Sequence, residues 1–363
     1  MCLTNTLRRW QKNQGEFHLL LHNAQHRRNI KVKVLVTGAG GFVGGHLVDL
    51  LLERGEPVRI LARPGEDLTR LAQAGVEVCR GDLTDHPSLE AAIDGVDRVL
   101  HCAARTGPWG PEAEYELVNV HGLKILVEAA MAAGVRRIVH VSSVTVHGVD
   151  VHGTADETAP LRGGADPYSR TKVAGEQLLQ QLICDKGAPV TIVRPGLIYG
   201  PRDTNSFGRF ARLVEQGKMV IIGSGNNHLP LIYVRDVAQG ILLASEADQA
   251  IGRAYLLVND EPVTQHDYFN ALSRELSVPP PSRHIPYRLS LALGATAETL
   301  GHLTRMKQPP PLMRFGLKLI AGENRFVISR ARCELGFVPQ VNLADGVHEG
   351  IAWYRATRPA ENL

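Results

Sequence analysis

Apolar positions alternate between short runs rich in Val, Ile and Leu and longer segments whose apolar residues recur every three or four positions. The short runs have the length of buried β-strands, and the longer segments have the spacing of amphipathic α-helices. The pattern predicts strands at 31–36, 57–61, 76–79, 97–102, 136–142 and 190–194, and helices at 42–53, 113–133 and 167–186. Because strands alternate with helices, we expect an α/β protein with a doubly wound parallel sheet covered by helices on both faces.

The pattern loosens after residue 195, where prolines cluster and apolar runs shorten. We therefore expect residues 31–195 to form the main domain and residues 196–358 a smaller, mixed substrate-binding region. The apolar run at 254–258 predicts another buried strand that can rejoin the sheet, which would leave the two parts partly interleaved. Residues 1–30 are polar and basic, and we expect a disordered extension there rather than a targeting signal.

The bulk composition excludes several classes of protein. The 363 residues suffice for one large or two moderate domains with a substantial core. A net charge of +3 is too small to favour nucleic acid as a partner. No stretch approaches the roughly 18 uninterrupted apolar residues of a membrane-spanning helix. The five cysteines are scattered without close pairing, which favours a reduced, cytoplasmic setting.

A glycine-rich turn follows the first predicted strand and leads into the first helix. Gly38 permits the sharp turn, Gly41 lets a phosphate approach the backbone, and Gly44 lets the helix pack closely on the strand. The helix begins at Phe42 and Val43, where free N–H groups and the positive dipole end can bind a pyrophosphate. A glycine turn without a ligand is the alternative, but the strand before it and the helix after it favour a Rossmann-type NAD(P) site.

The preference between the two nicotinamide cofactors depends on the end of the second strand, where a carboxylate would bind the 2′-hydroxyl of NAD. Ala62 occupies that place, and Arg63 follows it. A guanidinium can hold a 2′-phosphate, so Arg63 favours NADP(H) over NAD(H), although it can also be a solvated loop residue. Glu66 and Asp67 lie close enough to weaken this preference. After the third strand, Asp82 either accepts from the adenine amino group or makes an Asx turn.

Tyr168 and Lys172 stand four residues apart in a predicted helix, so they share one of its faces. At ~4 Å and an effective dielectric of about 20, an ammonium attracts a phenolate by ~4 kcal/mol, which can lower a tyrosine pKa by up to about three units. A tyrosine near neutrality can exchange a proton with a carbonyl or alcohol oxygen. Ser143 ends the fifth strand, where it can hold that oxygen against Tyr168, whereas Ser142 is expected to be structural. The tyrosine–lysine pair alone is common by chance, but the glycine turn and the serine strand together favour catalysis.

These motifs resemble those of the extended short-chain dehydrogenases/reductases, from Lys31 essentially to the C-terminus. The matching segments are 37–44, Asp82, 101–104, 119–122, 142–143, Tyr168 with Lys172, 194–196 and 233–238. The resemblance implies a catalytic tetrad of Asn119, Ser143, Tyr168 and Lys172, in which Asn119 anchors a proton-relay water and Lys172 also binds the nicotinamide ribose. It further implies cofactor contacts at Leu83, Ala103 and Pro195. A homodimer formed through the helices that carry Asn119 and Tyr168 is typical of the family.

The C-terminal third is similar to the 3β-hydroxysteroid dehydrogenase-like branch, which includes sterol carboxylate dehydrogenases and bacterial 2-alkyl-3-oxoalkanoate reductases. The similar segments are 283–286, 309–320 and 335–339. Sugar-nucleotide members typically hold a diphosphate with an arginine and an aspartate where this chain has Leu229 and Pro230. A buried diphosphate without a cation is costly, so the resemblance implies a hydrophobic substrate, steroid-like or β-keto acid-like. Trp109, Thr145 and His147 are the candidate substrate contacts.

Several alternatives stay open at this point. Residues 311–320 can form a lid or rest on a membrane surface, although an ordinary core helix is preferred. His284 and His348 are expected to be surface or packing residues, and no histidine spacing predicts a metal. A sugar epimerase or dehydratase with an internal redox cycle would use the same residues without net cofactor turnover. A non-catalytic NADP-sensing protein is a third alternative, and the intact tetrad argues against it.

Overall fold

A seven-stranded parallel sheet forms the centre of the structure, a computed structural model that describes residues 33–151 and 153–358. Its strand order is β12-β7-β5-β4-β1-β2-β3. The strands are β1 (Val34–Thr37), β2 (Val58–Ala62), β3 (Glu77–Arg80), β4 (Arg98–His101), β5 (Arg137–Val141), β7 (Val190–Pro195) and β12 (Ala254–Leu257). Because β1 pairs with β2 on one side and β4 on the other, the chain winds outward from β1 in both directions. The predicted doubly wound α/β fold is confirmed, while the extension expected at 1–30 lies outside the described residues.

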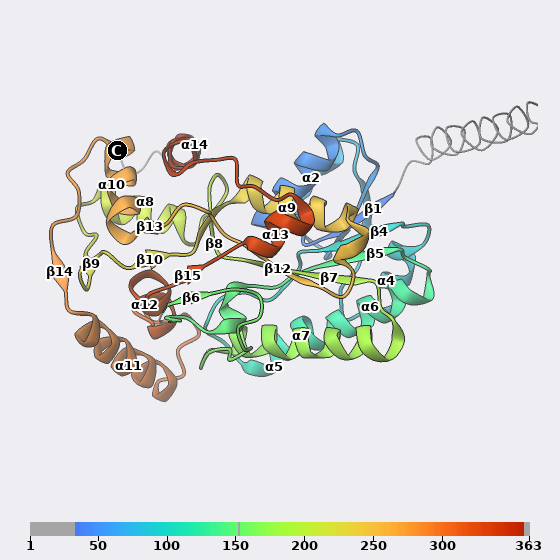
Figure 1. Cartoon of the computed structure of the whole chain (residues 1–363), viewed down its shortest axis with the longest axis horizontal. Coiled ribbons are helices and arrows are strands. Elements are labelled where there is room, and N and C mark those ends of the chain that lie inside the picture. The colour runs from blue at the N-terminus through green and yellow to red at the C-terminus, as the bar shows by residue number, and fades with distance from the viewer. Residues whose placement is uncertain (1–32, 152, 359–363) are drawn as a thin grey trace, which may run out of the picture.

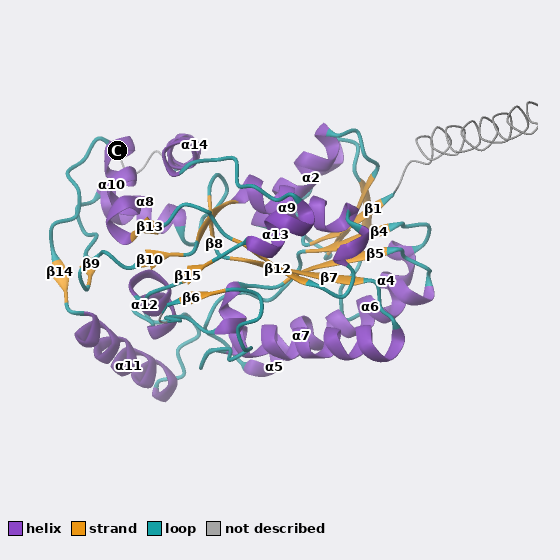
Figure 2. Cartoon of the chain, viewed as in Figure 1, coloured by secondary structure: helices purple, strands orange, loops and turns teal. Residues whose placement is uncertain are grey.

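Helices cover both faces of this sheet (Figures 1 and 2). Val34 and Val36 of β1 belong to a core shared with α2 (Phe42–Glu53) and α9 (Val234–Glu246). Leu35 lies between them in sequence and belongs to the opposite core. The helices of that second core are α4 (His86–Ile93), α6 (Leu123–Ala132) and α7 (Pro167–Lys186). Successive strand residues point to opposite faces, so continuous apolar strands fill both layers.

The ends of α7 are set by residues that favour helix termini. Asp166 is the N-cap and accepts a hydrogen bond from the Ser169 amide at 2.8 Å. Pro167 occupies the first helical position, and Gly187 ends the helix in the left-handed conformation. The helix has the predicted bounds of 167–186, and its first two turns present the candidate tyrosine and lysine.

The long helix predicted at 113–133 is divided into three parts. It consists of α5 (Glu112–Glu116), a π-helical segment η1 (Leu117–Gly122) and α6. The prediction of one regular α-helix is wrong here, because a π turn widens the hydrogen-bond ring and changes the direction of the following side chains. Such turns are frequent at functional sites, and η1 carries Asn119.

The region after residue 196 is mixed, as expected. Its strands β8 (Leu197–Tyr199), β9 (Ile221–Ile222), β10 (His228–Leu229), β11 (Leu231–Tyr233), β13 (Val263–Thr264), β14 (His284–Ile285) and β15 (Arg325–Phe326) form two-stranded ladders with one another or with β6 (Thr154–Ala155). Its helices are α8 (Phe207–Glu215), α10 (Gln265–Leu276), α11 (Tyr287–Leu303), α12 (Arg314–Ala321), α13 (Ser329–Leu335) and α14 (Leu343–Thr357). The remaining short elements of the described chain are α3 (Thr69–Gln73), η2 (Val144–His147) and η3 (Asp248–Ala250).

A strand and a core helix were predicted in this region, at 254–258 and 311–320. The run at 254–258 forms β12, which pairs in parallel with β7 and thereby returns to the main sheet. Leu317 and Ile320 of α12 are buried, as the core-helix interpretation of 311–320 requires. Across residues 33–151 and 153–358, no helix has both the length and the apolar character needed to cross a membrane.

Candidate active site

The turn between β1 and α2 is a cradle of backbone atoms. Gly38 has a φ of +71°, and a Cβ there would lie 2.7 Å from the Ala103 amide nitrogen. A Cβ on Gly44 would lie 2.2 Å from the carbonyl oxygen of Gly38. Gly41 caps the helix without a side chain, so it leaves the amides of the first turn open to an anion. These contacts admit only glycine at two positions and fit the pyrophosphate of a dinucleotide.

A cavity of about 660 Å³ lies over this turn and along the carboxyl ends of the central strands. Its walls include every residue assigned from the sequence to the cofactor: Gly38, Gly41, Phe42, Val43, Gly44, Arg63, Asp82, Leu83, Ala103, Lys172 and Pro195. Ser143 and Tyr168 line the same cavity. The structure therefore brings the two predicted groups of residues to one crevice, while their binding roles stay predictions.

The adenosine end of this crevice contains both a cation and a carboxylate. The Arg63 side chain is 70% exposed, and its Nε lies 2.8 Å from Glu66 Oε1. Arg80 donates to the carbonyl oxygens of Arg63 and Glu66, which fixes the loop after β2. Asp82 Oδ1 accepts from the amide and the hydroxyl of Thr84, so the Asx turn is present even though Asp82 lines the cavity.

The half-buried side chain of Tyr168 lies in the wall of the crevice. Burial raises the pKa of Tyr168 to about 12, although a hydrogen bond with Ser143 opposes this rise. Ser143 in turn accepts hydrogen bonds from the amide and hydroxyl of Thr145, at 3.2 and 3.1 Å. The serine hydroxyl is thus oriented toward the tyrosine by the residue two positions further along.

The Lys172 ammonium binds a backbone carbonyl, whereas the sequence predicted that it stabilises the Tyr168 phenolate at close range. Its Nζ donates to the carbonyl oxygen of Val141 at 2.7 Å and lies 6.0 Å from the centre of the Tyr168 ring. Burial lowers the pKa of Lys172 to about 8, and the charge of Glu176 partly opposes this. The expected lowering of the tyrosine pKa is wrong for this structure, because burial of the phenol outweighs the other influences on it.

The Asn119 side chain forms hydrogen bonds with the backbone of Arg105 and does not line the crevice. Its Oδ1 accepts from the Arg105 amide at 2.8 Å, and its Nδ2 donates to the Arg105 carbonyl at 3.0 Å. Nδ2 also lies 3.1 Å from Thr171 Oγ1, on the helix that carries the tyrosine. The asparagine therefore ties the loop after β4 to α7, and the π turn of η1 places it between them.

A second cavity, of about 850 Å³, lies beside the first and is bounded by the C-terminal region. Trp109 and His147, two of the candidate substrate contacts, line it. Trp109 Nε1 donates to the Met306 carbonyl, and its ring packs on His302 with centroids 4.3 Å apart. Thr145 does not line either cavity, and its hydroxyl donates to Ser143, so the substrate contact expected there stays a prediction.

Comparison with known proteins agrees with this arrangement. The model of the NAD dependent epimerase/dehydratase family matches residues 34–257. The chain belongs to this family, the extended short-chain dehydrogenases/reductases. A 2-alkyl-3-oxoalkanoate reductase of Stenotrophomonas maltophilia is 33% identical over 326 residues, or 87% of this chain and 97% of that protein. Sterol demethylase protein B of Methylococcus capsulatus is 34% identical over 329 residues, or 88% and 98%.

Solved structures show the same fold. The crystal structure of gox2253 matches with a TM-score of 0.75 and 32% identity, over 90% of this chain and 98% of that one. A UDP-glucose 4-epimerase of Thermotoga maritima matches with a TM-score of 0.73 over 90% and 99%, but at 21% identity it bears on the fold alone. An NAD(P) cofactor is typical of the family, and the crevice over the glycine turn is the place where the sequence predicts that it binds.

A buried ion pair supports the active-site wall of this short-chain oxidoreductase. Glu176 accepts from Arg194 at 2.6 Å, and their side chains are only 1% and 7% exposed. Ser142 donates to the same carboxylate at 2.5 Å, which agrees with its expected structural role. Arg194 also lies 3.1 Å from His147 Nε2, so the network reaches the second cavity. Glu176 was not predicted as a site residue from the sequence, although an acid one turn after Lys172 on the same helix face was a usable signal.

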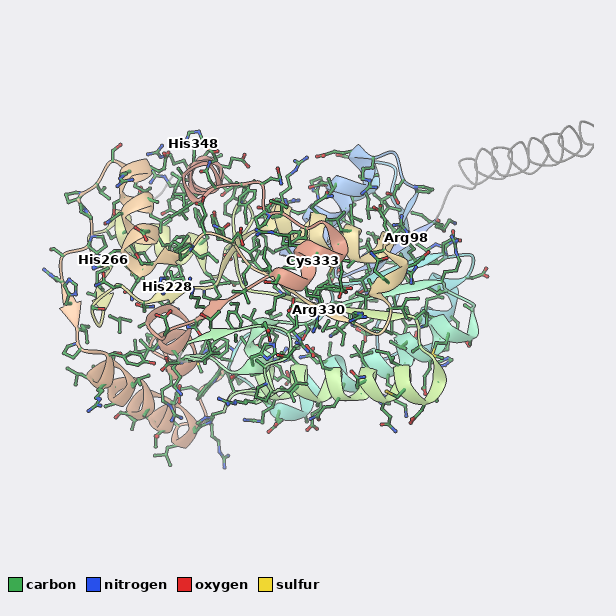
Figure 3. All side chains as sticks on the ribbon, in the orientation of Figure 1. Arg98, His228, His266, Arg330, Cys333 and His348 are labelled. Atoms are coloured by element: carbon green, nitrogen blue, oxygen red, sulfur yellow. The ribbon has the colours of Figure 1, made fainter. Side chains whose placement is uncertain are left out.

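In the described part of the chain, no group of three or more His, Cys, Asp or Glu side chains is placed so that it could hold a metal ion. His228, His266 and His348, labelled in Figure 3, lie on β10, α10 and α14. His348 contacts Glu275, and His284 lies 3.1 Å from the Gly223 carbonyl.

Proposed function

We propose that this enzyme reduces a ketone, or oxidises the matching secondary alcohol, on a hydrophobic substrate. The observation that carries the proposal is the position of Tyr168 between the two cavities. The tyrosine lines the cofactor crevice together with Ser143, while its neighbours Asp166 and Pro167 line the second cavity. A carbonyl in the second cavity can therefore reach the phenol and the serine hydroxyl at the edge of the nicotinamide site.

The protonation of these groups favours reduction. A pKa of about 12 keeps the Tyr168 phenol protonated at neutral pH, so it can donate its proton to a developing alkoxide. Ser143 shares a hydrogen bond with that phenol and can hold the reacting oxygen against it. Lys172, with a pKa of about 8, is charged at neutral pH and stabilises negative charge at the site. The bound nicotinamide supplies the hydride.

The second cavity supports a substrate that combines an apolar body with a carboxylate. Leu291, Met313 and Phe315 supply apolar wall, whereas Arg162 and Lys318 line the same cavity and form no ion pair with any described residue. Four carboxylates also line the cavity, but Glu112 and Glu298 are paired with arginines, and the cations of Arg162 and Lys318 favour an anionic group on the ligand. Of the two classes expected from the sequence, a β-keto acid fits better than a neutral steroid. Relatives named as 2-alkyl-3-oxoalkanoate reductases, at 33% and 31% identity, support this choice.

NADP(H) is the proposed cofactor in preference to NAD(H). Ala62 ends β2 without the carboxylate that would bind a ribose 2′-hydroxyl, and Arg63 extends over the crevice. Arg80 fixes the loop that carries Arg63 and adds positive charge beside it. Glu66 is the competing influence, because its carboxylate pairs with Arg63 and could accept from ribose hydroxyls instead.

The two rival functions, a sugar-nucleotide epimerase and a non-catalytic sensor, predict different experimental results. For a sugar-nucleotide epimerase, Leu229 and Pro230 leave the diphosphate without the usual arginine, and both positions carry no charge. An epimerase would also show no net consumption of NADPH. A non-catalytic sensor would bind NADPH without turnover on any carbonyl compound, although all four tetrad residues are present.

A substrate screen tests the proposal. The purified protein is mixed with NADPH or NADH and with 2-alkyl-3-oxo acids, their methyl esters, neutral steroid ketones or UDP-sugars, and loss of reduced-nicotinamide absorbance is followed. We expect turnover of the keto acids with NADPH, and weaker turnover of the uncharged esters. Equal turnover of acid and ester would remove the carboxylate argument. Cofactor binding without turnover of any ketone would leave the sensor as the better explanation.

We further propose a homodimer formed through α5, η1, α6 and α7. Leu117 of η1 is 49% exposed on these helices, which supports a covered surface there. Analytical ultracentrifugation of the wild type and Leu117→Glu tests it, since the charged variant should shift toward monomer. The reduced, cytoplasmic setting stays a prediction from the cysteines.

A further inference from the structure

Helix α11 carries a row of apolar side chains on its solvent side. Leu289, Leu293, Leu300 and Leu303 are 51%, 48%, 55% and 74% exposed, and Met306 just beyond the helix is 43% exposed. We call these five residues the leucine row. At 3.6 residues per turn the four leucines fall within a sector of about 80°. Five of the eight large hydrophobic side chains exposed in residues 33–151 and 153–358 belong to the row, so it is a patch rather than scattered exposure.

The other sides of α11 are already occupied. Ser290 and Gly294 are buried against other segments of the same chain. Three further side chains of the helix line the second cavity, those of Leu291, Ala295 and His302. Figure 1 shows α11 at the outer edge of the C-terminal region, with α12 on its inner side. The helix is therefore the outer wall of the proposed substrate cavity, and the leucine row faces away from the protein.

Cations flank the leucine row at both of its ends. Arg283 and Arg288 stand at the N-terminal end, and Arg305 and Lys307 at the C-terminal end. All four are exposed, and none forms an ion pair with a described residue. Glu298 is the one carboxylate in the sequence from 282 to 308, and it is buried in an ion pair of its own. Within residues 282–308, the exposed charges beside the row are thus all positive.

We propose that the leucine row docks on an anionic phospholipid surface. The leucines enter the boundary between headgroups and acyl chains, and the flanking cations lie at the level of the lipid phosphates. A second copy of the chain fits this surface poorly, because both ends of the row are cationic and would meet like charges in either orientation. Docking in this way places the wall of the cavity against the lipid. Membrane contact at 311–320 was one possibility from the sequence, but Leu317 and Ile320 of α12 are buried, whereas the leucines of α11 are exposed.

Vesicle co-sedimentation of the full chain, without substrate, tests the proposal separately from the proposed reaction. The probes are phosphatidylcholine vesicles with and without phosphatidylglycerol. The double substitution Leu293→Glu with Leu300→Glu disrupts the row. The matched control, Ile251→Glu with Val338→Glu, adds the same charge at side chains of similar exposure, 42% and 46%, outside the row. NADPH binding and thermal unfolding show that each variant is folded.

The wild type and the matched control should bind phosphatidylglycerol vesicles, and binding should weaken as salt is raised. The row variant should bind at least about tenfold more weakly. A second pair, Arg305→Gln with Lys307→Gln, should lower binding by roughly tenfold on anionic vesicles only. Equal binding by the wild type and the row variant overturns the proposal. Failure of the wild type to bind anionic vesicles also overturns it. If the row substitutions change only the oligomeric state, and not vesicle binding, the leucine row is a contact with a second copy of the chain.

Discussion

Lys172 and Val141 are joined by a 2.7 Å hydrogen bond from the lysine ammonium to the backbone carbonyl at the end of β5. The bond anchors the side chain at the carboxyl edge of the sheet, 6.0 Å from the centre of the Tyr168 ring. Because burial lowers the lysine pKa to about 8 and raises the tyrosine pKa to about 12, the two groups lose their protons in the order opposite to free side chains. The lysine, not the tyrosine, is therefore the group that titrates near neutrality.

The rate of ketone reduction should follow this order. Below pH about 8 the lysine is charged and the phenol is protonated, so kcat/KM should be flat; above it the lysine loses its charge and the rate should fall. Lys172→Met should lower kcat/KM by about a hundredfold and remove that inflection. The check is a pH–rate profile of both proteins at saturating NADPH. An unchanged inflection in Lys172→Met would assign the titration to another group.

Loss of the Tyr168 hydroxyl should remove the proton donor and leave the fold intact. We expect Tyr168→Phe to reduce ketone turnover by about 10²–10⁴-fold with little change in NADPH affinity. Tyr199→Phe is the control, because Tyr199 is a buried tyrosine that lines neither cavity. Steady-state kinetics and cofactor titration measure the two effects. Wild-type turnover by Tyr168→Phe would rule out the tyrosine as the acid.

Cofactor preference should respond to the two charges at the end of β2. Arg63→Ala removes the cation proposed for the 2′-phosphate, so it should weaken NADPH binding by about tenfold and leave NADH binding almost unchanged. Glu66→Gln removes the carboxylate beside it and should strengthen NADPH binding by a few-fold. Calorimetric titration of both cofactors measures the shift. If Arg63→Ala weakens both cofactors equally, the arginine only shapes the loop.

The buried pair of Glu176 and Arg194 should matter far more for stability than an exposed pair. Arg194→Leu leaves the Glu176 carboxylate buried without its partner, at a cost of about 3–5 kcal/mol. Arg332→Leu breaks the exposed pair with Asp260, where both side chains are 47% exposed, and should cost less than about 1 kcal/mol. Denaturant unfolding at neutral pH compares them. Similar losses in the two variants would contradict the role assigned to the buried pair.

His140 should contribute to acid sensitivity. It is 2% exposed, neither ring nitrogen has a hydrogen-bond partner among the described residues, and burial holds its pKa well below 6.5. The unfolded chain takes up a proton below its pKa of about 6.5 while the folded chain does not, so folding stability falls as the pH drops through that value. In His140→Leu this slope should shrink by up to about 1.4 kcal/mol per pH unit.

Denaturant unfolding of His140→Leu at several pH values between neutrality and the acid limb measures this slope. Above pH about 7 the substitution should be nearly neutral, since it removes no hydrogen bond to a described residue. A wild-type slope that persists in the variant would assign acid sensitivity to other groups, such as His101, whose pKa burial lowers to about 3.

The strands and helices around the cofactor crevice could largely be predicted, because the apolar spacing and the residues at the helix ends indicate the same elements. Helices α2 and α7 have the predicted bounds, since Gly41, Asp166 and Gly187 end or begin them by rules that act within one turn. The π turn of η1 could not be predicted, because it alters one hydrogen-bond ring without breaking the apolar spacing. The tyrosine pKa was predicted in the wrong direction. It depends on how deeply the whole fold buries the phenol, and no pair of residues reveals that depth.

The return of β12 to the sheet limits where the chain can be truncated or exchanged with a relative. β7 has β5 on one flank and β12 on the other, and β12 comes about sixty residues later in the chain. A nascent or truncated polypeptide that stops short of residue 257 keeps β7 as a bare edge, open to pairing with other chains. Recombinant fragments should therefore run past that residue, and chimaeras with relatives should exchange β7 and β12 together.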